Sequence, residues 1–216
     1  MLKLENIFVK KGKEEILDNI NLTVQKKDKI LILGESGSGK STLLKTIILF
    51  EKLDKGKIHF NNEMIKADNI QKYRRNFLYI GQKAPSFYGT VKQFLCLPFT
   101  FKNNHHVKPA DAVINKFITE FSFSESICGK NFEDLSGGEQ QRITIIQSLL
   151  LDRDILLLDE ITSNLDKHNA RKVIAKIMGF ANKTVIIVSH NALWQEHVTR
   201  MYKLENKQLY PIEKMK

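Results

Sequence analysis

Cysteine is scarce in this sequence, and long apolar segments are missing. Cys96 and Cys128 are the two cysteines, and no CxxC spacing joins them. A disulfide is possible on spacing alone, but we expect two reduced thiols, as in a cytosolic protein. Apolar runs such as TIILF and ILLLD are far too short to cross a bilayer. The opening stretch MLKLENIFVKKGKEE lacks the apolar segment of a secretory signal, so we expect any role at a membrane to come through a partner.

Internal repeats and low-complexity segments are also missing. The length of 216 residues suits one well-buried domain, and the composition of 42% hydrophobic and 27% charged residues is typical of a soluble globular protein. The net charge of +10 favours polyanionic partners, which are nucleotides, nucleic acid or an anionic membrane face. A solvated lysine-rich surface would account for the same charge, so charge alone identifies no ligand.

The pattern of apolar residues predicts an α/β protein. Helical periodicity is expected at 40–51, 110–121, 137–151 and 168–179. Short apolar runs or alternation predict strands at 2–9, 16–24, 29–33, 57–61, 77–81, 155–159 and 184–188. Several of these strands are continuously apolar, which suits a parallel sheet covered by helices. Ligands of such sheets bind at the carboxyl ends of the strands, where polar residues follow here.

Two further segments have their own character. Residues 83–135 contain Pro85, Pro98 and Pro109 and the loop-like stretch KNNHHVKP, which indicates a helical insertion in the core. The C-terminal stretch MYKLENKQLYPIEK is typical of a short hairpin, with a turn at Glu205–Lys207.

A phosphate-binding loop follows the predicted strand at 29–33. Gly34 to Ser41 fits G-x-x-x-x-G-K-[ST] without a mismatch, between the strand and the helix that this motif requires. Glycines let backbone N–H groups turn toward phosphates, and the helix N-terminus adds positive potential. Lys40 is expected to reach the β- and γ-phosphates, and the Ser41 hydroxyl to bind Mg²⁺. The residues predicted to bind the nucleotide here are Gly34, Glu35, Ser36, Gly37, Ser38, Gly39, Lys40, Ser41 and Thr42.

Acidic residues and a histidine follow two other predicted strands. Asp159 ends the strand ILLLD, where a carboxylate can complete the metal site begun by Ser41. Glu160 comes next and could orient or deprotonate an attacking water. His190 follows TVIIVS on the same edge, where we expect a contact with the γ-phosphate. The other histidines show no ligand spacing and are predicted to lie on the surface: His59, His105, His106, His168 and His197.

The stretch LSGGEQQR provides a second set of possible phosphate donors. Ser136 is a good helix N-cap, and Glu139 completes a capping box, so a well-formed helix start would explain both. Gly137 and Gly138, however, weaken a helix and make better sense if a phosphate approaches the backbone. Because the first site already has its own donors and acids, we expect this second set to serve the nucleotide of another subunit.

The order GESGSGKST, Gln82, LSGGEQQR, ILLLDE, SNLD and His190 resembles the ATP-binding subunit of an ABC transporter across nearly the whole chain. The resemblance implies a P-loop NTPase (RecA-like) core, an antiparallel β subdomain and a helical subdomain at about 83–146, all within one ABC ATPase domain at 1–216. It also implies hydrolysis of ATP with Mg²⁺, a second ATP-binding subunit paired head to tail as an ATP-dependent homodimer, and an integral-membrane permease subunit. The chain would then be cytoplasmic and peripheral to the inner face of the membrane.

The resemblance assigns roles that spacing does not. Gln82 would sense Mg²⁺ and the membrane partner, and Asp166 would communicate between the two ATP sites. The segment KAPSFYGTVKQF lies where the family receives helices of its membrane subunit. One departure concerns the base, because Lys11 precedes Gly12 where the family usually places an aromatic, and the nearest aromatic is Phe8. The combination of DEITS and GTVKQFLCLPF is similar to the Fet/YbbL-type bacterial subfamily linked to iron export, so a metal ion such as iron is the expected cargo.

Other classes of protein share some of these motifs. An ABC-type ATPase that acts on nucleic acid, in repair or on chromosomes, is the alternative and would explain the charge. Such proteins insert a long coiled coil between phosphate loop and signature, and the segment between Thr42 and Leu135 is short and lacks sustained heptads. A translation-associated protein would carry two cassettes, and a non-hydrolysing regulatory module would lack Glu160 or His190. We therefore expect a transport ATPase and no nucleic-acid partner.

Overall fold

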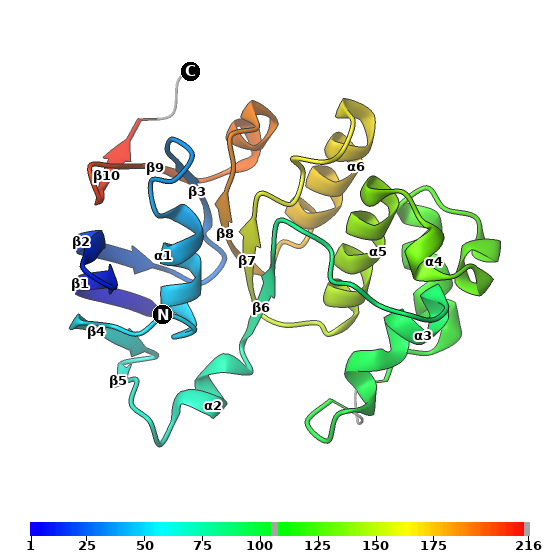
Figure 1. The fold of residues 1–216 in the computed structure, drawn as a ribbon, viewed down its shortest axis with the longest axis horizontal. Coiled ribbons are helices and arrows are strands. Elements are labelled where there is room, and N and C mark those ends of the chain that lie inside the picture. Colours follow the sequence, from blue (N-terminus) through cyan, green and yellow to red (C-terminus); the bar gives the residue numbers. More distant parts are fainter. Residues whose placement is uncertain (105–107, 214–216) are drawn as a thin grey trace. The chain divides into compact units, whose positions relative to one another are not determined.

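The computed structural model describes residues 1–104 and 108–213 (Figure 1). His105 and His106, predicted to lie on the surface, are outside the described residues. The chain divides into two compact units. The first unit contains Met1–Tyr79, Arg153–Glu160 and the chain from Phe180 onward, and the second contains Ile80–Asp152 and Ile161–Gly179.

The first unit begins with an antiparallel sheet of order β2-β1-β4-β5. Its strands are β1 (Leu2–Lys11), β2 (Glu14–Val24), β4 (Lys55–Phe60) and β5 (Glu63–Met64). Leu2, Leu4, Ile7 and Val9 of β1 are buried, and the shift in their alternation falls at Asn6, which has a φ of +49° at an irregularity of the ladder. The predicted antiparallel β subdomain near the N-terminus is thereby confirmed.

A second, six-stranded sheet has the order β10-β9-β3-β8-β7-β6. Its strands are β3 (Lys29–Leu33), β6 (Phe77–Ile80), β7 (Ile155–Asp159), β8 (Thr184–Val188), β9 (Arg200–Glu205) and β10 (Gln208–Ile212). The neighbours β3, β7, β8 and β9 pair in parallel. Every residue of β7 and β8 is buried, as continuous apolar runs predict for strands covered on both faces. The parallel pairing brings the ends of these strands to one edge of the sheet.

Turns at two places in the first unit follow from local backbone conformation. The predicted C-terminal hairpin is confirmed, with Asn206 and Lys207 both at positive φ between β9 and β10, as a tight two-residue turn requires. Helix α1 (Lys40–Ile47) is shorter than the predicted 40–51. It ends because Leu49 has a φ of +56° and the N–H of Phe50 donates to the Lys45 carbonyl, which is the hydrogen-bonding pattern of a Schellman cap. The first unit also contains α2 (Ile70–Arg74) and the 3₁₀ helix η5 (Ala192–His197).

The second unit is helical, and the predicted subdomain at about 83–146 falls within it. Its α-helices are α3 (Val91–Cys96), α4 (Asp111–Glu120), α5 (Gly137–Leu150) and α6 (Lys167–Met178), and its 3₁₀ helices include η1 (Leu97–Thr100), η3 (Glu125–Gly129) and η4 (Phe132–Asp134). The rings of Phe94 and Phe132 stack with centroids 4.2 Å apart in its core. Cys96 and Cys128 are free thiols. No helix in the described part of the chain is long and apolar enough to span a membrane.

Candidate active site

The phosphate loop joins β3 to α1 at the carboxyl edge of the six-stranded sheet. A side chain at Gly34 would place its Cβ 2.5 Å from the Leu204 carbonyl oxygen, and Gly39 has a φ of +99°. Only glycine fits both positions without strain. The Lys40 ammonium donates to the carbonyls of Gly34 (2.8 Å) and Glu35 (2.6 Å), so the loop closes around a cation.

Lys40 is 6% exposed, although it carries a positive charge. Burial lowers the pKa of its ammonium, and the carboxylates of Glu160 and Asp159 oppose this effect. Its two hydrogen bonds go to neutral carbonyls of the loop. A buried ammonium whose hydrogen bonds go to neutral carbonyls is well placed to attract a polyphosphate.

Asp159, at the end of β7, accepts hydrogen bonds at both carboxylate oxygens. The Ser41 hydroxyl donates to Oδ1 at 2.8 Å, and the Tyr79 hydroxyl donates to Oδ2 at 2.8 Å. Because the Ser41 hydroxyl is the donor in its hydrogen bond to Asp159, the lone pairs of its oxygen remain available to a cation. The structure thus brings Ser41 and Asp159 together, as the sequence predicts. Tyr79 was not among the predicted site residues, since an aromatic on a strand gives no sequence signal of this contact.

Glu160 and His190 follow β7 and β8 and meet at the same edge. The Glu160 side chain is 13% exposed and its Oε1 lies 3.2 Å from His190 Nε2. The backbone N–H of His190 also donates to Glu160 Oε2 at 3.3 Å. Glu160 has a φ of +51°, an unusual conformation for a residue with a side chain, and its N–H donates to the Val188 carbonyl. Backbone strain of this kind is common at functional sites, where the surroundings hold it in place.

A cavity of about 480 Å³ lies beside the phosphate loop. Its lining comes from the start of β2, from the loop and from the β9–β10 hairpin, and consists of Glu14, Glu15, Ile16, Glu35, Ser36, Gly37, Ser38, Lys203, Leu204, Glu205, Asn206 and Lys207. The residues that the sequence offered for base stacking are elsewhere among the described residues. The Lys11 ammonium pairs with Glu51 at 3.2 Å, and the Phe8 ring lies below the Lys55 ammonium.

The remaining histidines in the described residues have simple surroundings. His168 and His197 are exposed, as predicted. His59 is half-buried, which corrects its predicted surface position, and its Nε2 lies 3.3 Å from Glu5. His59 stands on β4, in register with Lys3 of the neighbouring strand β1.

The stretch LSGGEQQR begins helix α5 in the second unit. Ser136 is the N-cap, and the Glu139 carboxylate accepts from the Ser136 backbone N–H at 2.9 Å and from its hydroxyl at 2.7 Å. These bonds lower the pKa of Glu139 and confirm the predicted capping box. A Cβ at Gly137 would meet open space, whereas a Cβ at Gly138 would lie 3.3 Å from the Asn164 carbonyl oxygen. Close packing against the chain therefore gives Gly138 a reason to be glycine that the sequence did not indicate.

Asp166 is the N-cap of α6 in the same unit. Its Oδ1 accepts from the Asn169 backbone at 2.9 Å and its Oδ2 from the Asn169 amide at 2.6 Å, and these bonds lower its pKa. Asn169 Oδ1 accepts in turn from Arg142 of α5 at 3.3 Å. Sequence reasoning did not find this link, although an amide at the N3 position of a helix is a recognisable capping signal.

Gln82 lies shortly after β6 and is exposed. The side-chain amide of Gln141, on α5, donates at 3.2 Å to the backbone carbonyl of Gly81, the residue before Gln82. The predicted residues thus fall into two sets. Those at 34–42, together with Asp159, Glu160 and His190, belong to the first unit, and Gln82, Ser136, Gly137, Gly138 and Asp166 belong to the second.

A glycine loop that closes around a buried lysine, between a central parallel strand and a helix, defines a P-loop NTPase. Comparisons with known proteins specify the class further. The family model described as ABC transporter matches residues 17–163, which include the phosphate loop, LSGGEQQR and Glu160. The chain belongs to the ABC transporter family. It is an ATP-binding domain of that family and an ABC-type ATPase.

Two curated relatives and one solved structure illustrate the likeness. The chain is 35% identical over 208 residues to the probable iron export ATP-binding protein FetA of Escherichia coli, covering 95% of this chain and 91% of that protein. It is 31% identical to the mitochondrial ATP-dependent permease MDL1 of Saccharomyces cerevisiae, with 88% of this chain but 28% of that longer protein covered. The dimeric post-hydrolysis structure of the ATP-binding cassette MJ0796, bound to ADP and Pi, is 26% identical with a TM-score of 0.84, covering 100% of this chain and 99% of that one.

Proposed function

We propose that the chain is the ATP-hydrolysing subunit of a transporter, one ABC ATPase domain over 1–216 with a helical subdomain at about 83–146. It would drive a separate integral-membrane permease from the cytoplasmic face of the membrane. The observation that carries this proposal is the cluster at one sheet edge, where Lys40, Ser41, Asp159, Glu160 and His190 are joined by direct contacts or by adjacency in the chain.

In this proposal the loop from Gly34 to Thr42 wraps the phosphates of ATP. Lys40 exchanges its bonds to the loop carbonyls for bonds to the β- and γ-phosphates. The negative charge of a bound polyphosphate would offset the cost of burying the Lys40 ammonium better than the neutral loop carbonyls do.

The donors at the site fit Mg²⁺, which prefers hard oxygen ligands and keeps water and phosphate oxygens in its shell. The Ser41 hydroxyl and the Asp159 carboxylate supply such oxygens, with Gln82 as the third proposed metal residue. No group of three or more His, Cys, Asp or Glu side chains within 1–104 and 108–213 could hold an ion by itself, so ATP would complete the site. When bound, Mg²⁺ would neutralise charge on the phosphates.

Glu160 and His190 are assigned to the hydrolytic step. Glu160 orients a water and accepts its proton as the water oxygen bonds to the γ-phosphorus. The bond from that phosphorus to the bridging oxygen breaks, and ADP and phosphate leave. The contacts from His190 to Glu160 support a role in holding the carboxylate, and we assign its half-exposed ring to a contact with the γ-phosphate.

The signature is assigned to the ATP of a second subunit, with which the chain would form a homodimer when ATP is bound. Ser136 and Gly137 are exposed at the start of α5, and a Cβ at Gly137 would meet open space. Backbone donors at a positive helix end are therefore accessible to a phosphate from outside the chain. Asp166, which belongs to the same unit, is assigned to communication between the two ATP sites.

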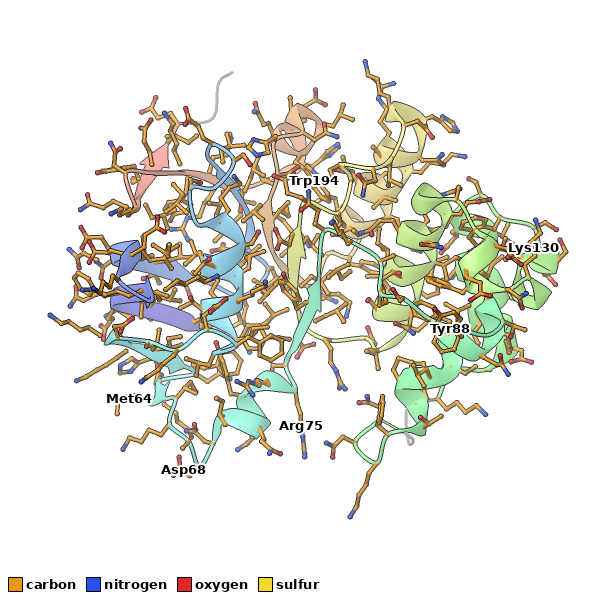
Figure 2. The ribbon with its side chains drawn as sticks, viewed as in Figure 1. Met64, Asp68, Arg75, Tyr88, Lys130 and Trp194 are labelled. Carbon is orange, nitrogen blue, oxygen red and sulfur yellow. The ribbon has the colours of Figure 1, made fainter. Side chains whose placement is uncertain are left out.

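The permease would dock on the second unit, where large apolar side chains are exposed. Tyr88, labelled in Figure 2, is 86% exposed and lies within the KAPSFYGTVKQF segment predicted for this contact. Phe101 and Val113 are exposed in the same unit. Apolar side chains in such positions are typical of protein interfaces.

For the cargo, we propose a metal ion such as iron. The support is FetA, which is described as an iron export protein and matches nearly the full length of both chains. The two curated relatives named above are described as an export protein and a permease, which favours transport over the nucleic-acid alternative.

The test combines hydrolysis and cargo. Glu160→Gln should lower steady-state ATP turnover by roughly 10²–10⁴ while ATP binding is retained, because an amide cannot accept the proton of the water. The exposed Glu63→Gln is the matched control. Cells in which Glu160→Gln replaces the wild-type chain should retain more iron under iron load. Near-normal hydrolysis would overturn the assignment of Glu160, and unchanged cell iron with hydrolysis lost would overturn only the cargo.

A further inference from the structure

The Asp159 carboxylate is held at both oxygens by hydroxyl groups from two different elements. Ser41, on α1, donates to Oδ1, and Tyr79, on β6, donates to Oδ2, each at 2.8 Å. Strand β6 is the neighbour of β7 in the six-stranded sheet, so the phenol reaches the carboxylate directly from the adjacent strand (Figure 1). Asp159 is 4% exposed, which leaves little room for water to replace either donor.

Two donors on one carboxylate fix its plane as well as its position. With Ser41 alone the group could still rotate about its terminal torsion, which is broad for Asp. The second hydrogen bond removes that freedom, and each oxygen keeps a lone pair for a further contact.

We propose that Tyr79 is a positioning residue of the metal site, which orients the Asp159 carboxylate toward the cation through its hydroxyl. The inference rests on the proposed role of Asp159 toward Mg²⁺. Outer-shell partners of metal-binding carboxylates commonly change metal affinity by about 10–100-fold when they are removed. Tyr79 acts here through Asp159 and does not itself contact the metal or the substrate.

The structure offers a matched control in Tyr73, which lies in the same unit. Its hydroxyl donates to the backbone carbonyl of Ile47 and touches no carboxylate. Tyr79→Phe and Tyr73→Phe each remove one hydrogen-bonded hydroxyl and keep the ring. The two variants therefore separate loss of a hydrogen bond in general from loss of the hydrogen bond to Asp159.

The experiment measures Mn²⁺ binding, with the free-ion electron paramagnetic resonance signal as readout. All proteins carry Glu160→Gln, which prevents turnover, and are loaded with one equivalent of ATP. Mn²⁺ is then titrated into this parent protein and into versions of it that also carry Tyr79→Phe, Tyr73→Phe or Asp159→Asn. Tyr79→Phe should weaken Mn²⁺ binding about tenfold. Tyr73→Phe should leave the Mn²⁺ affinity within twofold of that of the parent protein. The ATP affinity measured in EDTA should be the same in both tyrosine variants.

Three results have distinct meanings. Weaker Mn²⁺ binding in Tyr79→Phe and Asp159→Asn, but not in Tyr73→Phe, supports the inference. Weaker binding in Asp159→Asn alone overturns the role of Tyr79 and leaves the proposed metal site standing. Unchanged binding in Asp159→Asn overturns the proposed metal role of Asp159, and the inference with it.

Discussion

The phosphate loop of the first unit and the signature of the second unit satisfy their polar groups in different ways. Around the phosphate loop, Lys40 and Asp159 are 6% and 4% exposed. Lys40 donates to two carbonyls of its own loop, and Asp159 accepts from Ser41 and Tyr79, which are distant from it in the sequence. In the signature, Ser136 is exposed and its side chain bonds only to Glu139 of its own first turn. Buried networks are rigid before a ligand arrives, whereas an exposed capping box is stable as a helix end and remains open to another molecule. The phosphate loop is therefore organised within the chain, and the signature is accessible from outside it.

The largest expected effect tests whether the signature acts on a partner's ATP. Ser136→Arg and Lys40→Ala should each abolish nearly all steady-state hydrolysis when measured alone. In a head-to-tail heterodimer of the two variants, both lesions can fall on one site, which leaves the other with an intact Lys40 and an intact Ser136. The mixture should therefore recover activity, measured as steady-state ATPase against each variant alone.

A signature that served its own chain would give the reverse result. Each subunit would then carry one lesion, neither site would be whole, and mixing would restore nothing. Size-exclusion chromatography of the mixture with ATP verifies that heterodimers form. Absence of recovery in verified heterodimers would remove the distinction drawn between the two regions.

A smaller effect concerns the base of the nucleotide, and it tests whether the first unit distinguishes adenine from guanine. The cavity beside the phosphate loop has no aromatic lining, and Lys11 pairs with Glu51. Without a stacking partner, the chain should distinguish ATP from GTP by no more than about tenfold, a difference of ~1.4 kcal/mol. A competition titration checks this ratio. A much stronger preference for ATP would mean that polar groups of the lining, such as Glu14 or Asn206, read the adenine.

The smallest effect concerns the stability of the signature helix. The bonds from Ser136 lower the pKa of Glu139 below its ordinary value of 4.5. A depressed carboxyl pKa stabilises the folded state fully above the ordinary value, and this contribution is lost as pH falls through the lowered value. Glu139→Ala should therefore reduce the free energy of unfolding by roughly 0.5–1 kcal/mol at neutral pH.

Denaturant unfolding at several pH values measures this difference. The gap between wild type and Glu139→Ala should close in acid, while the exposed Glu133→Ala should show no such gap at any pH. A gap that persists unchanged below the lowered pKa would show that the Glu139 side chain stabilises the helix start through packing and not through its charge.

Patterns in the sequence were sufficient to predict the long helices α4 to α6, most strands and the local motifs of this protein. Continuous apolar runs predicted the buried strands β7 and β8 because a strand covered on both faces has no polar side. The phosphate loop and the capping box at Ser136 were predicted as well, because all of their groups lie within one turn or loop of each other. The predicted helices α4, α5 and α6 begin and end within about a residue of their observed bounds, as expected for strongly periodic segments.

Contacts between residues that are distant in the sequence depend on how the whole chain packs. Tyr79 contacts Asp159, Asn169 joins Asp166 to Arg142, and the β9–β10 hairpin lines the cavity beside the phosphate loop. The early end of α1 at Ile47 depends on the left-handed conformation of Leu49, which a non-glycine residue does not signal. Local patterns record backbone preference and burial, but the contact between two side chains depends on strand order and on the direction of each side chain. Those follow from packing of the whole chain.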